Sequence, residues 1–511
     1  MNALLNRRGV RTAALVLATL VTSAHVGSPD TWFQGMAGPY EVQAVVRLPG
    51  VIPGLAQIDI RVAGEGVEQV TAQPVVFDAG PEGAPPPDVA TPVAGRPGTY
   101  HAELWFMRSG SFSVTIAVRG ARGEGTVIVP VAAVPERQIP LYPWLGWLLA
   151  ALGTLLFAGA VTIFRAAGTD ALAAPGTGAA SGSAGARYAV LGAAILVAAL
   201  IGARGWWQSV EREYQAELYR PYAATALVDT AGGNRTLRFT ITDSVWTTRR
   251  ARNAWERFSV SPIVPDHGKL MHLFLIEADD PSSFAHLHPV PGADSSTFVA
   301  SLGALPPGRY RAFADVVHET GFPQTMVAEL SVPPALGDVP AGDPDDAMFT
   351  GRPSGAQWML ADGATVTWEG QRDTLEVDAD AGLRFTVREP DSTVARLEPY
   401  LGMAGHAVVY RTDGGVYVHL HPNGTISMVA QQAMAQRAPT DTAAGMLARR
   451  LAADTTHVSH AGQFGGVLAF PYAFPSAGRY RVWLQFRRGG QVMTALFDVE
   501  VRGDGRSASA S

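Results

Sequence analysis

The chain has 511 residues, of which 47% are hydrophobic and only 16% are charged. Soluble domains usually have about 25% charged residues, so this composition indicates that part of the chain lies in lipid. The net charge of -6 gives no basic field for nucleic acid, and that class of partner is excluded. The absence of cysteine excludes disulfides, zinc-thiolate centres and thiol nucleophiles.

Residues 1–25 predict a secretory signal peptide. Arg7, Arg8 and Arg11 precede an uncharged run that ends in small residues near Ala24, where cleavage is expected. An uncleaved signal anchor is the alternative, and it would also export the segment that follows. That segment, residues 29–135, has short Val- and Ile-rich runs between turn residues, which predict an extracytoplasmic β-sandwich.

Two apolar stretches predict a transmembrane hairpin. Residues 141–164 are uncharged and long enough to span a membrane, and residues 188–207 form the second, shorter helix. A buried helix of a soluble domain is the alternative for the second stretch. Aromatic residues favour the membrane interface, and here they mark the ends of the two stretches that adjoin the exported segments. Residues 165–187, between the opposite ends, are therefore expected to be a short cytoplasmic loop. The aromatic residues that mark the outer ends are Tyr142, Trp144, Trp147, Trp206 and Trp207.

The remainder of the chain contains an internal repeat. Leu237-Arg238-Phe239-Thr240-Ile241 matches Leu383-Arg384-Phe385-Thr386-Val387, and each is followed by a His-Leu-His and then a Gly-Arg-Tyr-Arg element. Repeats of this kind indicate two copies of one structural unit. We therefore expect β-sandwich repeats at residues 221–333 and 356–503.

A Pro-, Gly- and Asp-rich segment at residues 334–355 predicts a linker between the two repeats. Alanine-rich residues 428–453, interrupted by Pro439, predict two short helices inserted in the last module, and little other helix is expected outside the membrane. The predicted fold is mainly β, with three immunoglobulin-like β-sandwich modules plus a two-helix transmembrane hairpin.

Six of the 12 histidines lie on two predicted β-hairpins. The turn Asp413-Gly414 fixes the register of one hairpin and places His406 opposite His421. A register centred on Asp280 places His272 opposite His288 in the other. Strand side chains repeat with period two and cross-strand partners share a face, so three imidazoles should converge in each hairpin. The candidate metal ligands are His272, His286, His288, His406, His419 and His421, with His318 as an additional ligand.

Three neutral imidazoles at cross-strand spacing can chelate one ion, and imidazole suits copper and zinc. The cysteine-free, exported site favours copper, and Met271 or Met403 could add a thioether. A structural interpretation stays open beside this one. In it, the histidines are half-buried polar members of a sandwich core, hydrogen-bonded to one another or to the backbone.

The sequence contains no Gly-x-Ser-x-Gly, His-Glu-x-x-His or P-loop motif, so we expect neither an enzymatic activity nor an organic cofactor. The elements Gly308–Arg311 and Gly478–Arg481 predict a turn followed by a core tyrosine. The pair His318-Glu319 is expected to be a solvated part of an exposed loop.

The modules resemble the small exported β-sandwiches of the YtkA-like and FixH-like group, and more distantly the periplasmic copper carriers of the CopC type. The resemblance is carried by Gly98-Thr99-Tyr100, by His272 to Pro289 and by Gly308 to Arg311, in roughly half of the chain. It implies an extracytoplasmic location and metal handling. The amino-terminal histidine ligand of the copper carriers has no match here.

Together these features predict a membrane-anchored, extracytoplasmic (periplasmic) metal-binding protein without catalytic activity, with copper as the expected metal and zinc as the alternative. The competing prediction is a metal-free structural or protein-interaction module of a cell-envelope complex, whose partner is another envelope protein. A sensor is disfavoured because the predicted inner loop is too short to carry an output domain. The membrane is an expected partner in every case.

Overall fold

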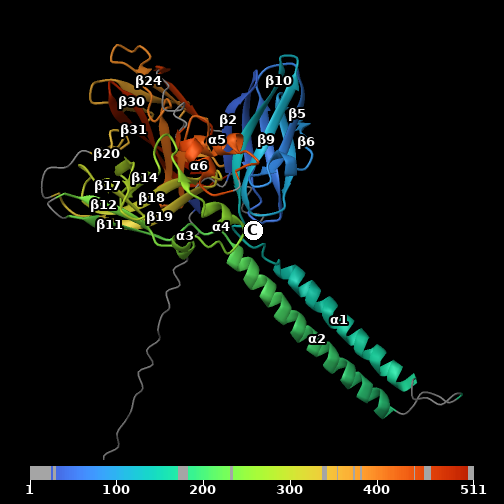
Figure 1. Cartoon of the computed structure of the whole chain (residues 1–511). Helices are drawn as coiled ribbons and strands as arrows, with labels where there is room; N and C mark the ends of the chain where they lie inside the picture. Colours follow the sequence, from blue (N-terminus) through green and yellow to red (C-terminus); the bar gives the residue numbers. More distant parts are fainter. Residues whose placement is uncertain are drawn as a thin grey trace, which may run out of the picture. The chain divides into compact units, whose positions relative to one another are not determined.

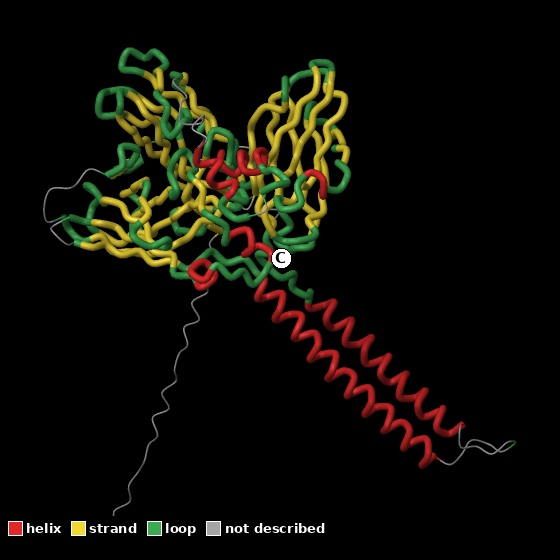
Figure 2. Tube along the Cα trace, viewed as in Figure 1, coloured by secondary structure: helices red, strands yellow, loops and turns green. Residues whose placement is uncertain are grey.

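The computed structural model describes residues 25–26, 30–170, 176, 182–230, 234–335, 342–353, 355–371, 374–379, 382–441, 443–453 and 462–503. Residues 1–24, which carry most of the predicted signal peptide, lie outside this set. Strands make up most of the described chain outside two long helices (Figure 2). The chain divides into a large unit, Asp30–Met348 with Ile426–His460, and a small unit, Met1–Pro29 with Phe349–Thr425 and Ala461–Ser511.

The first module is a two-sheet sandwich in the large unit. Its strands β3 and β4 alternate buried and more exposed residues, as expected when one face of a sheet packs on a core. The sheet orders are β2-β3-β4-β8-β7 and β10-β9-β5-β6. The elements are β2 (Asp30–Ala37), β3 (Tyr40–Arg47), β4 (Gly54–Val62), β5 (Val67–Val76), η1 (Pro81–Gly83), β6 (Asp88–Val89), β7 (Thr91–Pro92), β8 (Thr99–Phe106), β9 (Gly110–Gly120) and β10 (Gly123–Ala133).

Two long apolar helices follow, α1 (Pro143–Asp170) and α2 (Gly182–Glu217), and they lie side by side (Figure 1). Glycines permit the close approach, because a Cβ at Gly168 would overlap the Tyr188 ring and one at Gly192 would overlap Phe164. Both helices are long and apolar enough to cross a membrane. Their apolar side chains are largely exposed, which is the arrangement that lipid rather than a protein core would cover.

The helices extend further than the sequence predicts. Residues 165–170 and 182–187 are helical, although they belong to the predicted loop, since alanine has the highest helix propensity. At the other end, α2 continues past Trp207 to Glu217. There the Tyr214 hydroxyl donates to the Arg137 carbonyl at 3.1 Å, and Trp255 Nε1 donates to the Glu217 carbonyl at 2.9 Å. The second helix is therefore continuous with a stem that is hydrogen-bonded to the β-modules of the large unit.

The second module is also a sandwich of the large unit, with sheet orders β11-β12-β17-β16 and β13-β18-β14-β15-β20, and with β19 on β18. Two short helices, α3 (Ser244–Thr248) and α4 (Ala254–Ser259), were not predicted, although they add little to the helix content. Side chains of Asp243 and Asn253 cap their first turns. The strands are β11 (Ala224–Asp229), β12 (Thr236–Ile241), β13 (Ile263–Val264), β14 (His272–Glu277), β15 (Ser283–Leu287), β16 (Val290–Pro291), β17 (Thr297–Ser301), β18 (Gly308–His318), β19 (Pro323–Val332) and β20 (Ala347–Thr350).

The third module forms the small unit, with sheet orders β21-β22-β24-β29 and β1-β27-β26-β30-β31-β23 and a short pair, β25-β28. Phe497 of one sheet packs on Trp368 and Phe385 of the other, with ring centroids 5.9 Å and 5.3 Å apart. The strands are β1 (His25–Val26), β21 (Gln357–Met359), β22 (Thr365–Glu369), β23 (Thr374–Glu376), β24 (Leu383–Arg388), β25 (Arg396–Leu397), β26 (His406–Arg411), β27 (Val416–Leu420), β28 (Phe464–Gly465), β29 (Val467–Phe470), β30 (Gly478–Arg488) and β31 (Gln491–Arg502).

The repeated Gly-Arg-Tyr-Arg elements have the structural role that the sequence predicts. Gly308 begins β18 and Gly478 begins β30. The buried hydroxyl of Tyr310 donates to the Pro306 carbonyl at 2.9 Å, and that of Tyr480 donates to the Ser476 carbonyl at 2.8 Å. Each tyrosine thus ties the start of its strand to the turn four residues earlier.

Two predicted segments differ from the structure. Residues 334–355 are not only a linker, because β20 lies within them and pairs with β15. The predicted insert does form two helices, α5 (Met428–Gln436) and α6 (Met446–Ala453), but it belongs to the large unit rather than to the last module. Its apolar residues pack against β13 and β18 of the second module. Sequence position does not determine which core a short amphipathic helix joins.

Candidate metal centre

The two histidine hairpins have the predicted register. In the large unit Leu273 pairs with Leu287 and Phe274 with His286, which brings His272 level with His288. In the small unit Val408 pairs with His419, which brings His406 level with His421. The register of the second hairpin follows from its two-residue turn, that of the first was inferred by analogy with it, and both predictions are confirmed.

Three imidazoles come together in each hairpin, and the two groups have nearly the same internal geometry. We call His272, His286 and His288 the first trio, and His406, His419 and His421 the second trio. In the first trio, in the order 272–286, 272–288 and 286–288, ring centroids lie 5.4, 5.2 and 4.5 Å apart. The corresponding distances in the second trio are 5.4, 5.1 and 4.5 Å.

The trios lie on the face of their sheets that is turned away from the sandwich core, and most of their rings are nevertheless buried. Leu273, Leu275 and Leu287 belong to the sandwich core of the large unit, and the histidines alternate with them in sequence. In the small unit, Val409 aligns across β30 with Phe497, which packs on the opposite sheet. These histidines therefore lie on the opposite face of their sheets from the residues that pack between the two sheets of each sandwich. Met271 lies in that core and is directed away from the trio.

The nitrogen atoms of the first trio are close enough to share an ion. One ligand nitrogen from each of its three histidines lies within 4.8 Å of the others. His272 Nδ1 is 3.1 Å from His286 Nε2. Two nitrogens bound to one tetrahedral zinc at about 2.0–2.1 Å would be separated by roughly 3.3 Å. The hairpin thus provides near-chelating geometry without a change of backbone.

Hydrogen bonds select which nitrogen faces the neighbouring rings in His272 and His288. His272 Nε2 is 3.3 Å from the Asp266 carbonyl, which can only accept, so this nitrogen carries the hydrogen and Nδ1 keeps a lone pair. His288 Nδ1 is 3.0 Å from Asp346 Oδ1. Its Nε2 is buried and has no hydrogen-bond partner among the described residues. A buried lone pair without a donor is the condition that a bound cation would relieve.

Burial favours the neutral form of two imidazoles of the first trio, His272 and His288. It lowers the pKa of His272, against the opposing effect of the Asp266 carboxylate. Burial, reinforced by the neighbouring imidazoles, lowers the pKa of His288 well below its usual value. Burial raises the pKa of Asp346 to about 6. At neutral pH the 3.0 Å contact therefore joins a neutral imidazole donor to a carboxylate, and the imidazoles are in the form that binds metals.

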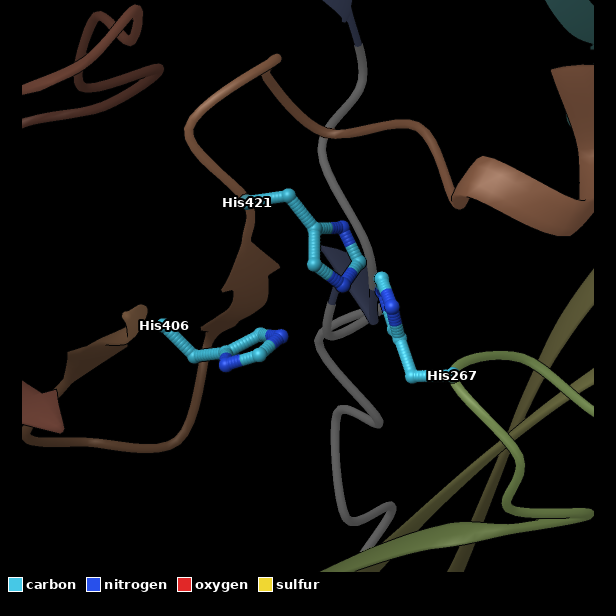
Figure 3. A group of neighbouring side chains, drawn as sticks. All are labelled: His267, His406 and His421. Atoms are coloured by element: carbon cyan, nitrogen blue, oxygen red, sulfur yellow. The ribbon is translucent and has the colours of Figure 1, made fainter. Parts of the chain in front are cut away.

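The second trio repeats the ring spacing of the first in the small unit. His406 and His421 are almost completely buried, and His419 is partly exposed. Figure 3 shows the side chains of His406, at the start of β26, and His421, just after β27, directed into the same space. The Tyr400 ring lies edge-on to His406 with centroids 5.3 Å apart.

His318 joins neither trio. Its Nδ1 lies 2.8 Å from the Ser261 carbonyl and its Nε2 lies 3.3 Å from Gln324 Oε1. Both ring nitrogens are therefore occupied by protein groups. The prediction of His318 as an additional ligand did not anticipate that its strand, β18, places it beside α3 and α4 rather than beside the hairpin.

The neighbouring Glu319 is buried and not solvated, which corrects the expectation of an exposed loop pair. Its carboxylate accepts from the backbone N–H groups of Gly445, at 2.7 Å, and Ala448, at 3.0 Å, at the start of α6. Asp266 holds the other inserted helix in a similar way, since its Oδ1 accepts from Val429 N at 3.1 Å. Both carboxylates act as helix caps.

Sequence reasoning missed the acidic residues beside the first trio. Asp343 and Asp346 come from the segment assigned to the linker, yet His288, Asp343 and Asp346 form a group whose potential ligand atoms lie within 4.8 Å of one another. The three aspartates at 343, 345 and 346 were visible in the sequence. Their position next to His288 depends on tertiary structure.

Comparisons with known proteins give little functional information. Residues 359–503 match a family model described as "Domain of unknown function (DUF8832)", and no curated protein matches the chain. Similar solved structures include a tetra-tandem repeat of a large adhesion protein, with 10% identity over 88% of this chain and 71% of that chain, at a TM-score of 0.13. Another is an ICAM-5 D1-D4 ectodomain fragment, with 9% identity over 91% of this chain and 78% of that chain, at a TM-score of 0.15. Likeness at this level carries no argument about function, and the resemblance to YtkA-like and FixH-like sandwiches stays a prediction.

Proposed function

We propose that this protein is a membrane-anchored, extracytoplasmic metal-binding protein whose two histidine trios each hold one ion. The observation that supports the proposal most directly is the repetition of one three-imidazole geometry on the outward faces of two different modules. Core packing does not require this arrangement, because the opposite face of each hairpin sheet packs in the sandwich core.

Three neutral imidazoles favour copper over zinc. Divalent copper binds nitrogen ligands more tightly than divalent zinc does, and neither trio offers a thiolate that would select otherwise. A three-nitrogen site leaves a further coordination position for water or a ligand supplied by a partner. The protein is thus suited to hold an ion or pass it on.

The location forms part of the proposal. The apolar helices α1 and α2 would anchor the chain, with the aromatic residues of both helices at the outer interface. The three sandwiches would then lie on the extracytoplasmic side. An export signal in residues 1–25 would be consistent with that side.

Metal titration of the full-length protein in detergent tests the proposal. After chelator treatment, we expect the wild type to bind two Cu²⁺ ions per chain and, more weakly, two Zn²⁺ ions. His288→Ala and His421→Ala should each bind one ion, and the double variant none. His101→Asn is the matched control, because His101 lies in the first module and contacts Asp59. Isothermal calorimetry and elemental analysis give the stoichiometry.

Lack of stoichiometric binding by the wild type would disprove the metal proposal. A binding isotherm unchanged in the double variant would do the same. Either result would favour the alternative, in which the trios are hydrogen-bonded supports of an envelope module that interacts with another protein. The contacts of His286 with His272 at 3.1 Å and with the stacked Phe274 ring at 4.1 Å give that alternative its physical basis.

A further inference from the structure

The segment that follows the second module lies against the first trio. It includes Asp343, Asp345 and Asp346, and we call residues 342–346 the acidic strap. The strap leads directly into β20, which pairs with β15, the strand that carries His286. Pairing of β20 with the histidine hairpin therefore holds the strap beside His288.

Asp346 holds His288 by two hydrogen bonds. Its Oδ1 accepts from the His288 backbone N–H at 2.8 Å and from Nδ1 at 3.0 Å. Its other oxygen, Oδ2, accepts from the Asp343 backbone N–H at 3.0 Å. The carboxylate is thus fixed at both oxygens before any ion binds. A carboxylate that accepts from one ring nitrogen of a histidine commonly orients the other nitrogen toward a metal.

The consequence for His288 is specific. With Nδ1 donating to Asp346, the neutral ring presents the lone pair of Nε2, and this buried atom has no other hydrogen-bond partner among the described residues. His272 uses the other nitrogen as donor. Its Nε2 faces the Asp266 carbonyl, and its Nδ1, which keeps the lone pair, faces His286. Backbone and carboxylate acceptors therefore orient two of the three rings.

Charge distinguishes the first trio from the second. Lys269 Nζ lies 2.5 Å from Asp343 and 3.0 Å from Asp345, so an ammonium group offsets part of the strap's charge. On the adjacent strand β18, Asp315 is the register partner of His272. In the second hairpin the corresponding partner of His406, on β30, is the uncharged Gln485. The first trio has the Asp346 carboxylate in contact with His288, and negative charge there favours a doubly charged ion over a singly charged one.

We propose that the acidic strap makes the first trio a site for a divalent ion, Cu²⁺ or Zn²⁺, with Asp346 as the residue that positions His288. This inference rests on the proposed metal-binding function and adds the charge selectivity of one of its two sites. Loss of an outer carboxylate of this kind typically lowers metal affinity by about 10- to 100-fold.

The test uses the full-length protein with His421→Ala, in which only the first site remains. In this parent, Asp346→Asn should weaken Cu²⁺ and Zn²⁺ binding by about 10- to 100-fold. It should weaken Cu⁺ binding, measured by competition with a chromogenic chelator, by a clearly smaller factor, because loss of the positioning acts on both ions whereas loss of the negative charge acts more strongly on divalent ones. Asp345→Asn is the matched control, because it removes the same charge from the same strap at a residue that pairs with Lys269. It should leave divalent affinity within about threefold of the parent.

Asp346→Glu should restore part of the divalent affinity and keep the parent-type electron paramagnetic resonance spectrum of bound Cu²⁺. This variant also provides a readout if the Asn variant proves unstable. The inference is overturned if Asp346→Asn leaves divalent affinity unchanged while the parent binds, or if it weakens Cu⁺ binding equally. If the parent binds no ion, the proposed function itself has failed, and the two failures are thus distinguishable.

Discussion

Burial controls the state of individual histidines in this protein, and His318 shows the effect outside the trios. It is fully buried, and burial lowers its pKa to about 4. The Ser261 carbonyl can only accept, so the hydrogen of the neutral His318 ring lies on Nδ1. Its Nε2 has no hydrogen and must accept a hydrogen bond from another group. If the side-chain amide of Gln324 is rotated by half a turn, its NH₂ group faces His318 Nε2 and donates to it. The same rotation gives a partner to Gln324 Nε2, which otherwise has none among the described residues.

His318 should make stability depend on pH. Its folded pKa of about 4 lies below the usual 6.5, so the unfolded chain binds the proton more readily. The stabilisation is complete above pH 6.5 and is lost as the pH falls toward 4, with a total near 3 kcal/mol. We expect the free energy of unfolding, from urea titrations followed by tryptophan fluorescence, to fall over this range.

The variant His318→Gln identifies the source of that slope. It should be less stable than the wild type at pH 7, but it should lose less stability on acidification. A variant with the same slope between pH 6.5 and 4 as the wild type would show that another group is responsible.

At the scale of elements, the inserted helices are attached by carboxylates of the second module. Glu319 caps α6 and Asp266 accepts from the first turn of α5. A negative charge at a helix N-terminus also interacts favourably with the helix dipole. These two contacts, together with apolar packing, explain why the insert belongs to the large unit.

Glu319→Ala should destabilise the attachment of α6 by about 1–2 kcal/mol, as loss of a helix cap typically does. Glu319→Gln, which keeps one acceptor, should have a smaller effect. Hydrogen exchange at the Gly445 and Ala448 amides measures this directly, with Glu329→Ala on the exposed side of β19 as the control. Unchanged exchange in Glu319→Ala would show that apolar packing alone holds the helix.

Elements differed in how far the sequence could specify them. The register of the second hairpin was predictable because a two-residue turn and a period of two are local properties, and the first register followed from its likeness to the second. The helices α3 and α4 were not predicted, since elements of five or six residues are too short to show periodicity, although Asp243 and Asn253 were available as caps. The strand β20 was missed because its pairing with β15 is a long-range contact.

At the scale of the whole molecule, the fold class is confirmed as mainly β, with β-sandwiches and two apolar helices that can form a hairpin. The outward orientation of the sandwiches is the part of the proposal that labelling can test. The chain has no cysteine, so any introduced thiol is unique.

Ser295→Cys lies in an exposed turn before β17, and Asp170→Cys lies at the exposed end of α1. We expect a membrane-impermeant maleimide to label Ser295→Cys in intact spheroplasts and Asp170→Cys only after permeabilisation. The unmodified protein serves as the blank. The opposite pattern would place the sandwiches in the cytoplasm.

The sequence by itself determined the β-modules, the apolar hairpin and the histidines of each trio, because alternation, apolar length and turn chemistry act over a few residues. Only the tertiary structure decided that the trios lie on the outward faces of their sheets, that His318 is occupied elsewhere, and that Asp346 holds His288. These outcomes depend on which segments pack together across long stretches of sequence, and no local pattern encodes that choice.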